Sequence, residues 1–110
     1  MGDDPSLRAH LAMAKHPDKV PVHISVAKND KNISDLDRHH YLIDKDFTVG
    51  HVVYIIRKKI ELSSKKAIFV FVDNGILPPT SALISDIYQQ HRDPVTALLY
   101  ITFRTENTFG

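Results

Sequence analysis

From residue 20 to residue 27, Val or Ile occupies every second position, from Val20 to Val26, and other residue types occupy the positions between and after them. This period of two predicts a β-strand with one buried face. The connection that follows opens with NDKN, which is typical of a turn. A second strand is expected around HHYLID, residues 39–44. The two segments are therefore predicted to pair as a hairpin.

A helical period of apolar residues follows this hairpin. Thr48 is expected to cap the helix, and Ile55 falls at the edge of its buried stripe. The stripe itself consists of Val49, Val52, Val53, Ile56 and Ile60.

Two later stretches, AIFVFVD (67–73) and ALLYITFRT (97–105), are apolar almost without interruption. Such runs predict strands that are covered on both faces, and we expect the first of them to be central in the sheet. The segment between them, ALISDIYQQH (82–91), predicts a short helix with Thr80 or Ser81 as its cap.

Residues 3–17 predict one short helix, with Asp4 as its cap and Leu7, Leu11 and Ala14 on one face. The whole order is then helix, two hairpin strands, a crossover helix, a strand, a helix and a last strand. This order is typical of an α+β, ubiquitin-like β-grasp fold with a mixed four-stranded sheet.

The length of 110 residues indicates a single domain. We expect a helical extension over residues 1–17, shortened to one helix, a ubiquitin-like domain over residues 18–105, and a flexible C-terminal tail over residues 106–110.

Composition excludes several classes of site. The chain contains no cysteine, which rules out disulfides, thiolate metal sites and a thiol nucleophile within it. No apolar run approaches the length that spans a bilayer. The net charge of +1 and the lack of an aromatic stacking platform argue against a nucleic-acid-binding domain.

Motifs for catalysis are absent as well: the sequence has no glycine-rich phosphate loop, no nucleophile elbow and no HExxH. Neither enzyme activity nor a cofactor is expected. His39 and His40 follow Asp37, but adjacent side chains on a strand point to opposite faces and no third ligand follows, so no metal site is expected. If His40 titrates near the ordinary pKa of about 6.5, acidic peptides should bind better at lower pH.

Seven segments occur in a specific order: HPDKVPV, DLDRHHYLI, TVGHVVYIIRKKI, AIFVFVDN, LPPTSAL, IYQQHRD and ENTFG. Together they resemble the GABARAP and light-chain-3 family of autophagy ubiquitin-like modifiers, over the range from about His16 to Gly110. Single pieces such as TVG or PPT are common, whereas the ordered set is specific.

The resemblance implies that Gly110 is coupled to the amine of phosphatidylethanolamine and that Phe109 helps the enzymes to hold the tail. The implied partners are ubiquitin-like activating and conjugating enzymes, a cysteine deconjugating protease, and receptors and adaptors with short aromatic-x-x-aliphatic motifs. The implied location is the cytoplasm and, after lipidation, the autophagosomal membrane. Family members carry two helices ahead of the core, so functions of the first helix are in doubt for this chain.

The resemblance also implies a peptide-binding edge at RHHYLI, where a bound peptide would add a strand. An aromatic pocket is expected to consist of Pro21, His23, Leu42 and Leu98. An aliphatic pocket is expected to consist of Tyr41, Ile43, Phe47, Val52 and Ile55. Contacts to acidic residues of the peptide are expected from Lys19, Arg38, His40 and Lys59. For Phe47 and Val52, ordinary core packing is the alternative.

Two other functions remain open at this point. The chain could be a peptide-binding adaptor of the same fold that is never conjugated, or a modifier of proteins rather than of lipids.

Overall fold

A computed structural model describes residues 5–28, 30, 33, 35–63, 65–73 and 75–107. The predicted order of helices and strands is confirmed. The elements are α1 (Pro5–Lys15), β1 (Lys19–Val26), β2 (His40–Asp44), α2 (Val49–Lys59), β3 (Lys66–Phe71), α3 (Ile84–His91) and β4 (Leu99–Asn107).

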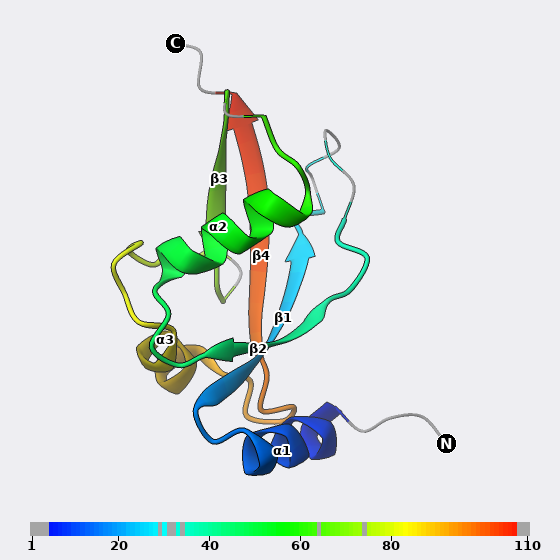
Figure 1. The fold of residues 1–110 in the computed structure, drawn as a ribbon, viewed down its shortest axis with the longest axis vertical. Helices are drawn as coiled ribbons and strands as arrows, with labels where there is room; N and C mark the ends of the chain where they lie inside the picture. Colours follow the sequence, from blue (N-terminus) through cyan, green and yellow to red (C-terminus); the bar gives the residue numbers. More distant parts are fainter. Residues whose placement is uncertain are drawn as a thin grey trace.

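The strands form a mixed sheet in the order β2-β1-β4-β3. β1 pairs antiparallel with β2, as the predicted hairpin requires, and parallel with β4, while β3 pairs antiparallel with β4. α2 lies across one face of this sheet (Figure 1). The α+β, ubiquitin-like prediction with four strands is confirmed.

The position predicted for β3 is wrong, because β3 lies at an edge of the sheet and β1 and β4 are central. Ile68 and Val70 of β3 are buried, whereas Phe69 and Phe71 on its other face are half-buried. The guanidinium of Arg104 lies 5.2 Å from the ring centroid of Phe71. The apolar run therefore reflects aromatic side chains on a partly exposed face rather than a strand with neighbours on both sides.

The core lies between the sheet and the helices. Its most deeply buried side chains, each below 2% exposed, are Phe103, Ile24, Ile56, Ile84, Leu99, Ile101, Val22, Val52 and Val72. Burying one such side chain contributes roughly 1.5–3 kcal/mol.

The prediction that Thr48 caps α2 is confirmed. Its Oγ1 accepts from the backbone N–H of His51 at 3.2 Å, and its own N–H donates to Nδ1 of His51 at 3.0 Å. These two bonds form a reciprocal capping box, in which a histidine replaces the usual Glu or Gln.

The predicted start of α3 is wrong. The helix begins at Ile84, its N-cap is Leu83, and neither Thr80 nor Ser81 caps it. The carbonyls of Thr80 and Ala82 instead accept from the N–H groups of Gly50 and Val49, both at 2.9 Å. Because the first N–H groups of a helix have no partner within it, this turn before α3 completes the start of α2.

The face of α1 that Leu11 and Ala14 share is exposed. Leu11 is 58% exposed and Ala14 is exposed. Met13 packs against the core instead, and the hydroxyl of Tyr88 lies 3.4 Å from its sulfur. The prediction for Asp4 and the side chain of Leu7 lie outside the described residues.

The last strand extends to Asn107, so the sheet includes two residues that the sequence assigns to the tail. α1 lies at one end of the molecule, and the C-terminal end of β4 lies at the other (Figure 1). In the described part of the chain, no helix combines the length and apolar character that a membrane crossing needs.

Candidate functional site

The edge of the sheet at β2 is the first component of the candidate site. In the described residues β2 pairs with β1 and with no other strand. Its side chains alternate as expected: Ile43 is 4% exposed, whereas Leu42 is 39% exposed. This confirms that one of the three apolar residues of the strand faces away from the core.

The face of the hairpin that bears Leu42 carries the residues predicted for the aromatic pocket. Leu42 lies opposite Pro21, and His23 lies opposite His40. Directly opposed residues share a face of the sheet, so these four side chains lie together. Leu98 is 5% exposed and directly precedes Leu99, the β4 partner of Val22, which brings it to the level of Pro21.

His23 is the centre of a cluster of rings on this face. Its ring centroid lies 5.3 Å from His39, 5.1 Å from His40 and 5.2 Å from Tyr100. The expectation that His39 and His40 point to opposite faces is therefore wrong. His39 precedes the first residue of β2, so strand alternation does not apply to it.

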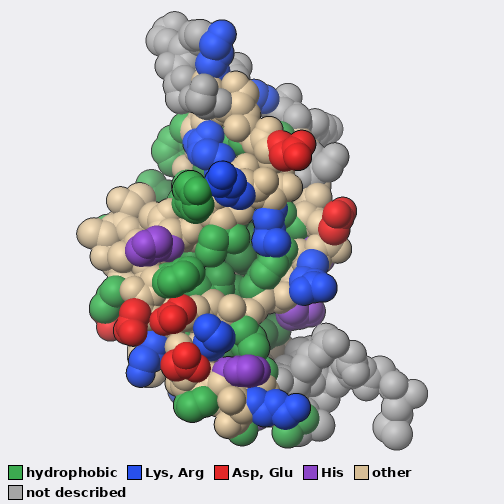
Figure 2. Space-filling view, in the orientation of Figure 1, with side chains coloured by type: hydrophobic (Ala, Val, Ile, Leu, Met, Phe, Trp, Pro, Cys, Tyr) green, Lys and Arg blue, Asp and Glu red, His purple; other side chains and the backbone are tan. Residues whose placement is uncertain are grey.

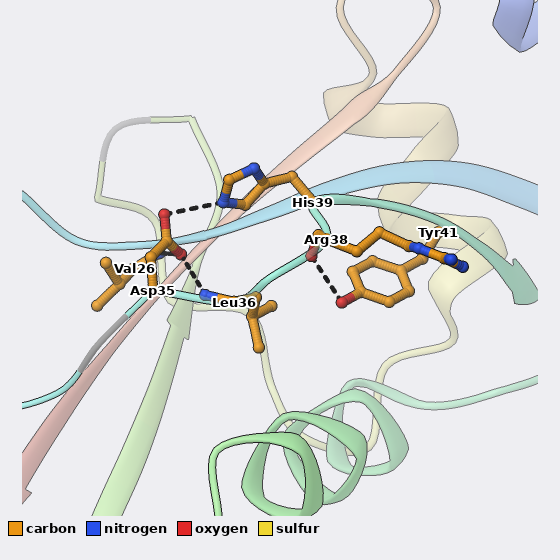
Figure 3. A network of polar contacts seen from close by, with 6 residues as sticks. All are labelled: Val26, Asp35, Leu36, Arg38, His39 and Tyr41. Atoms are coloured by element: carbon orange, nitrogen blue, oxygen red, sulfur yellow. Dashed lines mark hydrogen bonds and ion pairs between the residues drawn. The ribbon is translucent and has the colours of Figure 1, made fainter.

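Asp35 orients the ring of His39. Its Oδ2 lies 2.9 Å from Nε2 of His39, while its Oδ1 accepts from the backbone N–H groups of Val26 at 2.9 Å and Leu36 at 2.8 Å (Figure 3). Burial acts to raise the pKa of Asp35, but these hydrogen bonds outweigh it, and the pKa is lowered.

The pKa of His23 is lowered as well. Burial is the largest cause, followed by the neighbouring His40 and His39, while Asp35 acts in the opposite direction. The cluster therefore favours a neutral imidazole at its centre near neutral pH. No three His, Asp or Glu side chains among the described residues are arranged to hold a metal ion.

On the other face of β2, a cavity of about 740 Å³ lies between the β1–β2 connection, Tyr41 and the end of α2. Tyr41, Arg38 and Lys59 line it, and Asp35 and Asp37 add negative charge. The hydroxyl of Tyr41 donates to the carbonyl of Arg38 at 2.7 Å (Figure 3), and Nζ of Lys59 lies 5.3 Å from the centroid of the Tyr41 ring. Burial raises the pKa of Tyr41, so its hydroxyl stays protonated.

The residues predicted for the aliphatic pocket differ in how accessible they are. Val52 is fully buried and Ile43 nearly so, which means that core packing describes Val52 in this conformation. Phe47, Ile55 and Tyr41 are half-buried and pack against the core. Hydrophobic side chains gather between α2 and β2 on the face shown in Figure 2, with Lys and Arg side chains beside them.

The predicted basic contacts border both faces of β2. Arg38 and Lys59 line the cavity, His40 belongs to the ring cluster, and Lys19 lies opposite Asp44 across the hairpin. Gly110 and Phe109 lie outside the described residues.

Sequence reasoning missed Tyr100 and the approach of His39 to His23. Neither had a signal along the chain, because Tyr100 reaches His23 through the parallel pairing of β4 with β1. For Asp35, the spacing of four residues from His39 was a weak indication that the two side chains are in contact.

Comparison with known proteins was made by sequence and by structure. A family described as "Autophagy protein Atg8 ubiquitin like" matches residues 7–110. Autophagy-related protein 8 of Emericella nidulans is 52% identical over 102 residues, which cover 93% of this chain and 84% of that protein. Autophagy-related protein 8 of Schizosaccharomyces pombe is 50% identical over 96 residues, covering 87% and 77%.

The fold comparison agrees with the sequence comparison. The crystal structure of Trypanosoma brucei ATG8 superposes with a TM-score of 0.87 at 34% sequence identity. The match covers 96% of this chain and 89% of the other.

Proposed function

Because this chain belongs to the Atg8 family of ubiquitin-like autophagy proteins, we propose that it is a modifier coupled through Gly110 to phosphatidylethanolamine. On the autophagosomal membrane it recruits receptors and adaptors that carry short aromatic-x-x-aliphatic motifs. The ordered motifs, from HPDKVPV to ENTFG, favour its grouping with the GABARAP and light-chain-3 proteins.

The observation that supports peptide binding most strongly is the outer edge of β2, with which no other described strand pairs, together with the exposed Leu42. An extended peptide can add a strand there through backbone hydrogen bonds. Successive peptide side chains then point to opposite faces of the sheet. One face offers Pro21 and Leu42 for the aromatic residue, and the other offers Tyr41 and Ile55 for the aliphatic residue.

Cations beside this edge support a preference for acidic residues next to the motif. Arg38 and His40 are exposed near the start of β2, and Lys59 lies over the ring of Tyr41. Exposed ion pairs contribute only about 0–1 kcal/mol each, so these residues tune the affinity rather than create it.

His23 alters the aromatic pocket in a specific way. Its ring is half-buried and contacts two further imidazoles and a phenol. An apolar peptide ring that covers His23 would desolvate it further, which favours binding at a pH where His23 is neutral.

Conjugation uses the carboxylate of Gly110. ATP converts the carboxylate into an acyl-adenylate with release of pyrophosphate, a thiol of the enzymes displaces AMP, and the lipid amine then displaces the thiol to form an amide. Glycine suits these steps because it has no side chain to crowd the attacked carbonyl. In this scheme the chain is the substrate of the enzymes and not an enzyme itself.

The conjugation experiment incubates the chain with activating and conjugating enzymes, ATP and vesicles that contain phosphatidylethanolamine. The expected product has the added mass of the lipid less one water. Gly110→Ala is the matched control. Absence of an adduct, under conditions that lipidate another family member, would contradict the proposal and leave an unconjugated adaptor. An adduct on protein amines instead of lipid would indicate a protein modifier.

Peptide binding is tested separately with a fluorescent peptide that carries the motif. Leu42→Ala and Ile55→Ala should each weaken binding while the circular dichroism spectrum shows that each variant remains folded. Val95→Ala is a matched control, because Val95 is 76% exposed and lies in the loop before β4. Equal affinities for all three variants would place the binding surface elsewhere.

A further inference from the structure

The C-terminal end of the sheet carries a group of cations that the peptide-binding edge does not use. We call this group the basic end, and it consists of Lys28, Lys58, Lys65 and Lys66. Lys66 is half-buried and the other three side chains are exposed.

Three separate contacts bring these lysines to one end of the molecule. Lys66 pairs with Asn107, the last residue of β4. The N–H of Ala27, next to Lys28, donates to the carbonyl of Phe103 at 2.8 Å, which places the end of β1 four residues before Asn107 along β4. Nη2 of Arg57 donates to the carbonyl of Lys66 at 2.9 Å, which ties the last turn of α2, and with it Lys58, to the start of β3.

Basic side chains outnumber carboxylates among the described residues at this end. Oε1 of Glu106 pairs with Arg104 at 3.0 Å, and Asp30 is buried with its Oδ2 bound to Thr105. Glu61 is a further carboxylate here, and Asp35 lies at the end of β1, where its Oδ1 accepts from the N–H of Val26. Figure 2 shows Lys and Arg side chains, with an acidic side chain among them, on the side towards the C-terminal end of β4.

Chain length links the basic end to a membrane. Only residues 108–110 separate Asn107 from the α-carboxylate of Gly110, and three residues span at most about 11 Å. Once Gly110 is coupled to a lipid headgroup, Lys66 must stay near the bilayer surface. This reach is comparable with the Debye length of about 8–10 Å at physiological salt, so charges on the lipids act on the lysines.

We propose that the basic end is a docking surface for anionic lipid headgroups, which orients the protein on the membrane to which its tail is coupled. This inference rests on the proposed conjugation of Gly110. Charge complementarity and the short tail favour a lipid surface as the occupant.

The peptide-binding edge lies farther from the tail than Lys66 does. Tyr41 pairs with Val22, which pairs with Leu99 at the start of β4, eight residues before Asn107. At about 3.3 Å per residue, Tyr41 lies roughly 26 Å from Asn107 along the strand. Lys58 stands closer to the edge, because it precedes Lys59, whose Nζ lies over the ring of Tyr41.

The test bypasses the conjugating enzymes. Since the chain has no cysteine, Gly110→Cys provides a single thiol for a maleimide that carries one acyl chain of myristoyl length. One such chain binds bilayers only marginally and reversibly, so added electrostatic attraction is measurable. Partition is measured by sedimentation with phosphatidylcholine vesicles, with and without phosphatidylserine.

We expect tighter partition to the anionic vesicles. A variant with Lys28→Gln, Lys58→Gln and Lys66→Gln should partition to these vesicles on the order of 100-fold more weakly. One lysine near such a surface raises the partition coefficient by roughly fivefold. The same variant should be unchanged on neutral vesicles. Salt at about 1 M, where the Debye length is ~3 Å, should remove the difference.

The matched control replaces three lysines at the opposite end, Lys15, Lys19 and Lys45, by Gln, and it should partition like the parent. An equal loss in this control, or none in the basic-end variant, would overturn the proposal. A shared urea midpoint shows that the variants are folded. A basic-end variant that partitions normally but is conjugated slowly by the enzymes would also overturn it, because the lysines would then serve an acidic enzyme surface. Failure of wild-type conjugation contradicts the proposed function instead.

Discussion

The imidazole ring of His23 stacks on that of His39, with the centroids 5.3 Å apart and the planes inclined by 24°. His40 meets the same ring edge-on at 5.1 Å, and Tyr100 lies 5.2 Å away. Three protonated imidazoles at such distances would repel one another, and Asp35, bound to His39, supplies the opposing charge. The cluster therefore couples the stability of the hairpin to pH.

Stability should fall as the solution becomes acidic. The pKa of His23 is lowered in the folded protein, so the unfolded chain binds more protons once the pH drops below the ordinary value of about 6.5. The free energy of unfolding should decrease through the window between that value and the lowered pKa of His23. Urea midpoints at about pH 7.5 and about pH 5 measure the decrease.

His23→Leu should reduce this acid sensitivity, because the variant has no group to protonate at the centre of the cluster. His16→Gln, at an exposed residue after α1, should keep it. The lowered pKa of Asp35 acts at more acidic pH, below its ordinary value of about 3.9, and so outside this window. If His23→Leu remains as acid-sensitive as the parent, the origin of the effect lies elsewhere.

Thr48→Ala should destabilise the protein by about 1 kcal/mol, since Oγ1 of Thr48 caps the backbone N–H of His51. Ser81→Ala is the matched control, because Ser81 is exposed and does not cap α3. Its urea midpoint should stay close to that of the parent. A comparable loss in both variants would mean that the first turn of α3 depends on Ser81 after all.

Ile56 and Ile55 are neighbours on α2 with different environments. Ile56 is fully buried, and Ile56→Ala should cost about 2–5 kcal/mol of unfolding free energy. Ile55 is half-buried, and Ile55→Ala should cost roughly 1–2 kcal/mol. Equal losses in chemical denaturation would contradict the burial of α2 described above.

Asp30 secures the end of β4 beside the basic end. Its Oδ2 accepts from the N–H of Thr105 at 2.8 Å and from its hydroxyl at 2.9 Å, in a buried position. Asp30→Ala should therefore cost about 1–3 kcal/mol, because the buried donors lose their acceptor.

Thr105→Val removes only the hydroxyl and should cost less than Asp30→Ala. Hydrogen exchange should show faster exchange of the Thr105 amide in Asp30→Ala but not in Thr105→Val. An unchanged amide in Asp30→Ala would indicate that the strand end is held by its pairing with β3 alone.

Local patterns predicted most of the elements correctly, and the errors have a common origin. The alternation after Val20 and the helical period after Val49 each reflect one buried face, which packing against any partner satisfies. The predicted start of α3 failed because Thr80 and Ala82 are occupied with the N–H groups of α2, a contact between segments about 30 residues apart. The continuous apolar run of β3 could not show that this strand lies at an edge of the sheet, because aromatic residues can also cover a partly exposed face.

The features of the candidate site likewise divide into those that a local pattern predicted and those that only tertiary contacts set. Alternation within HHYLID alone required one of Tyr41, Leu42 and Ile43 to face away from the core, and Leu42 does so. The meeting of Leu42 with Pro21 depends on the register of the hairpin, and the approach of Tyr100 to His23 depends on the parallel pairing of β1 with β4.

The sequence by itself determined the order of the elements, the caps and faces of the main helix, and the family to which its motifs point. Periodicity and capping are local properties that depend on residues within a few positions of each other. Only the tertiary structure decided which strand is at the edge, which rings surround His23, and that the lysines of the basic end lie towards one end of the sheet. These relationships join residues far apart in the chain, whose proximity is set by strand register and by packing of the shared core.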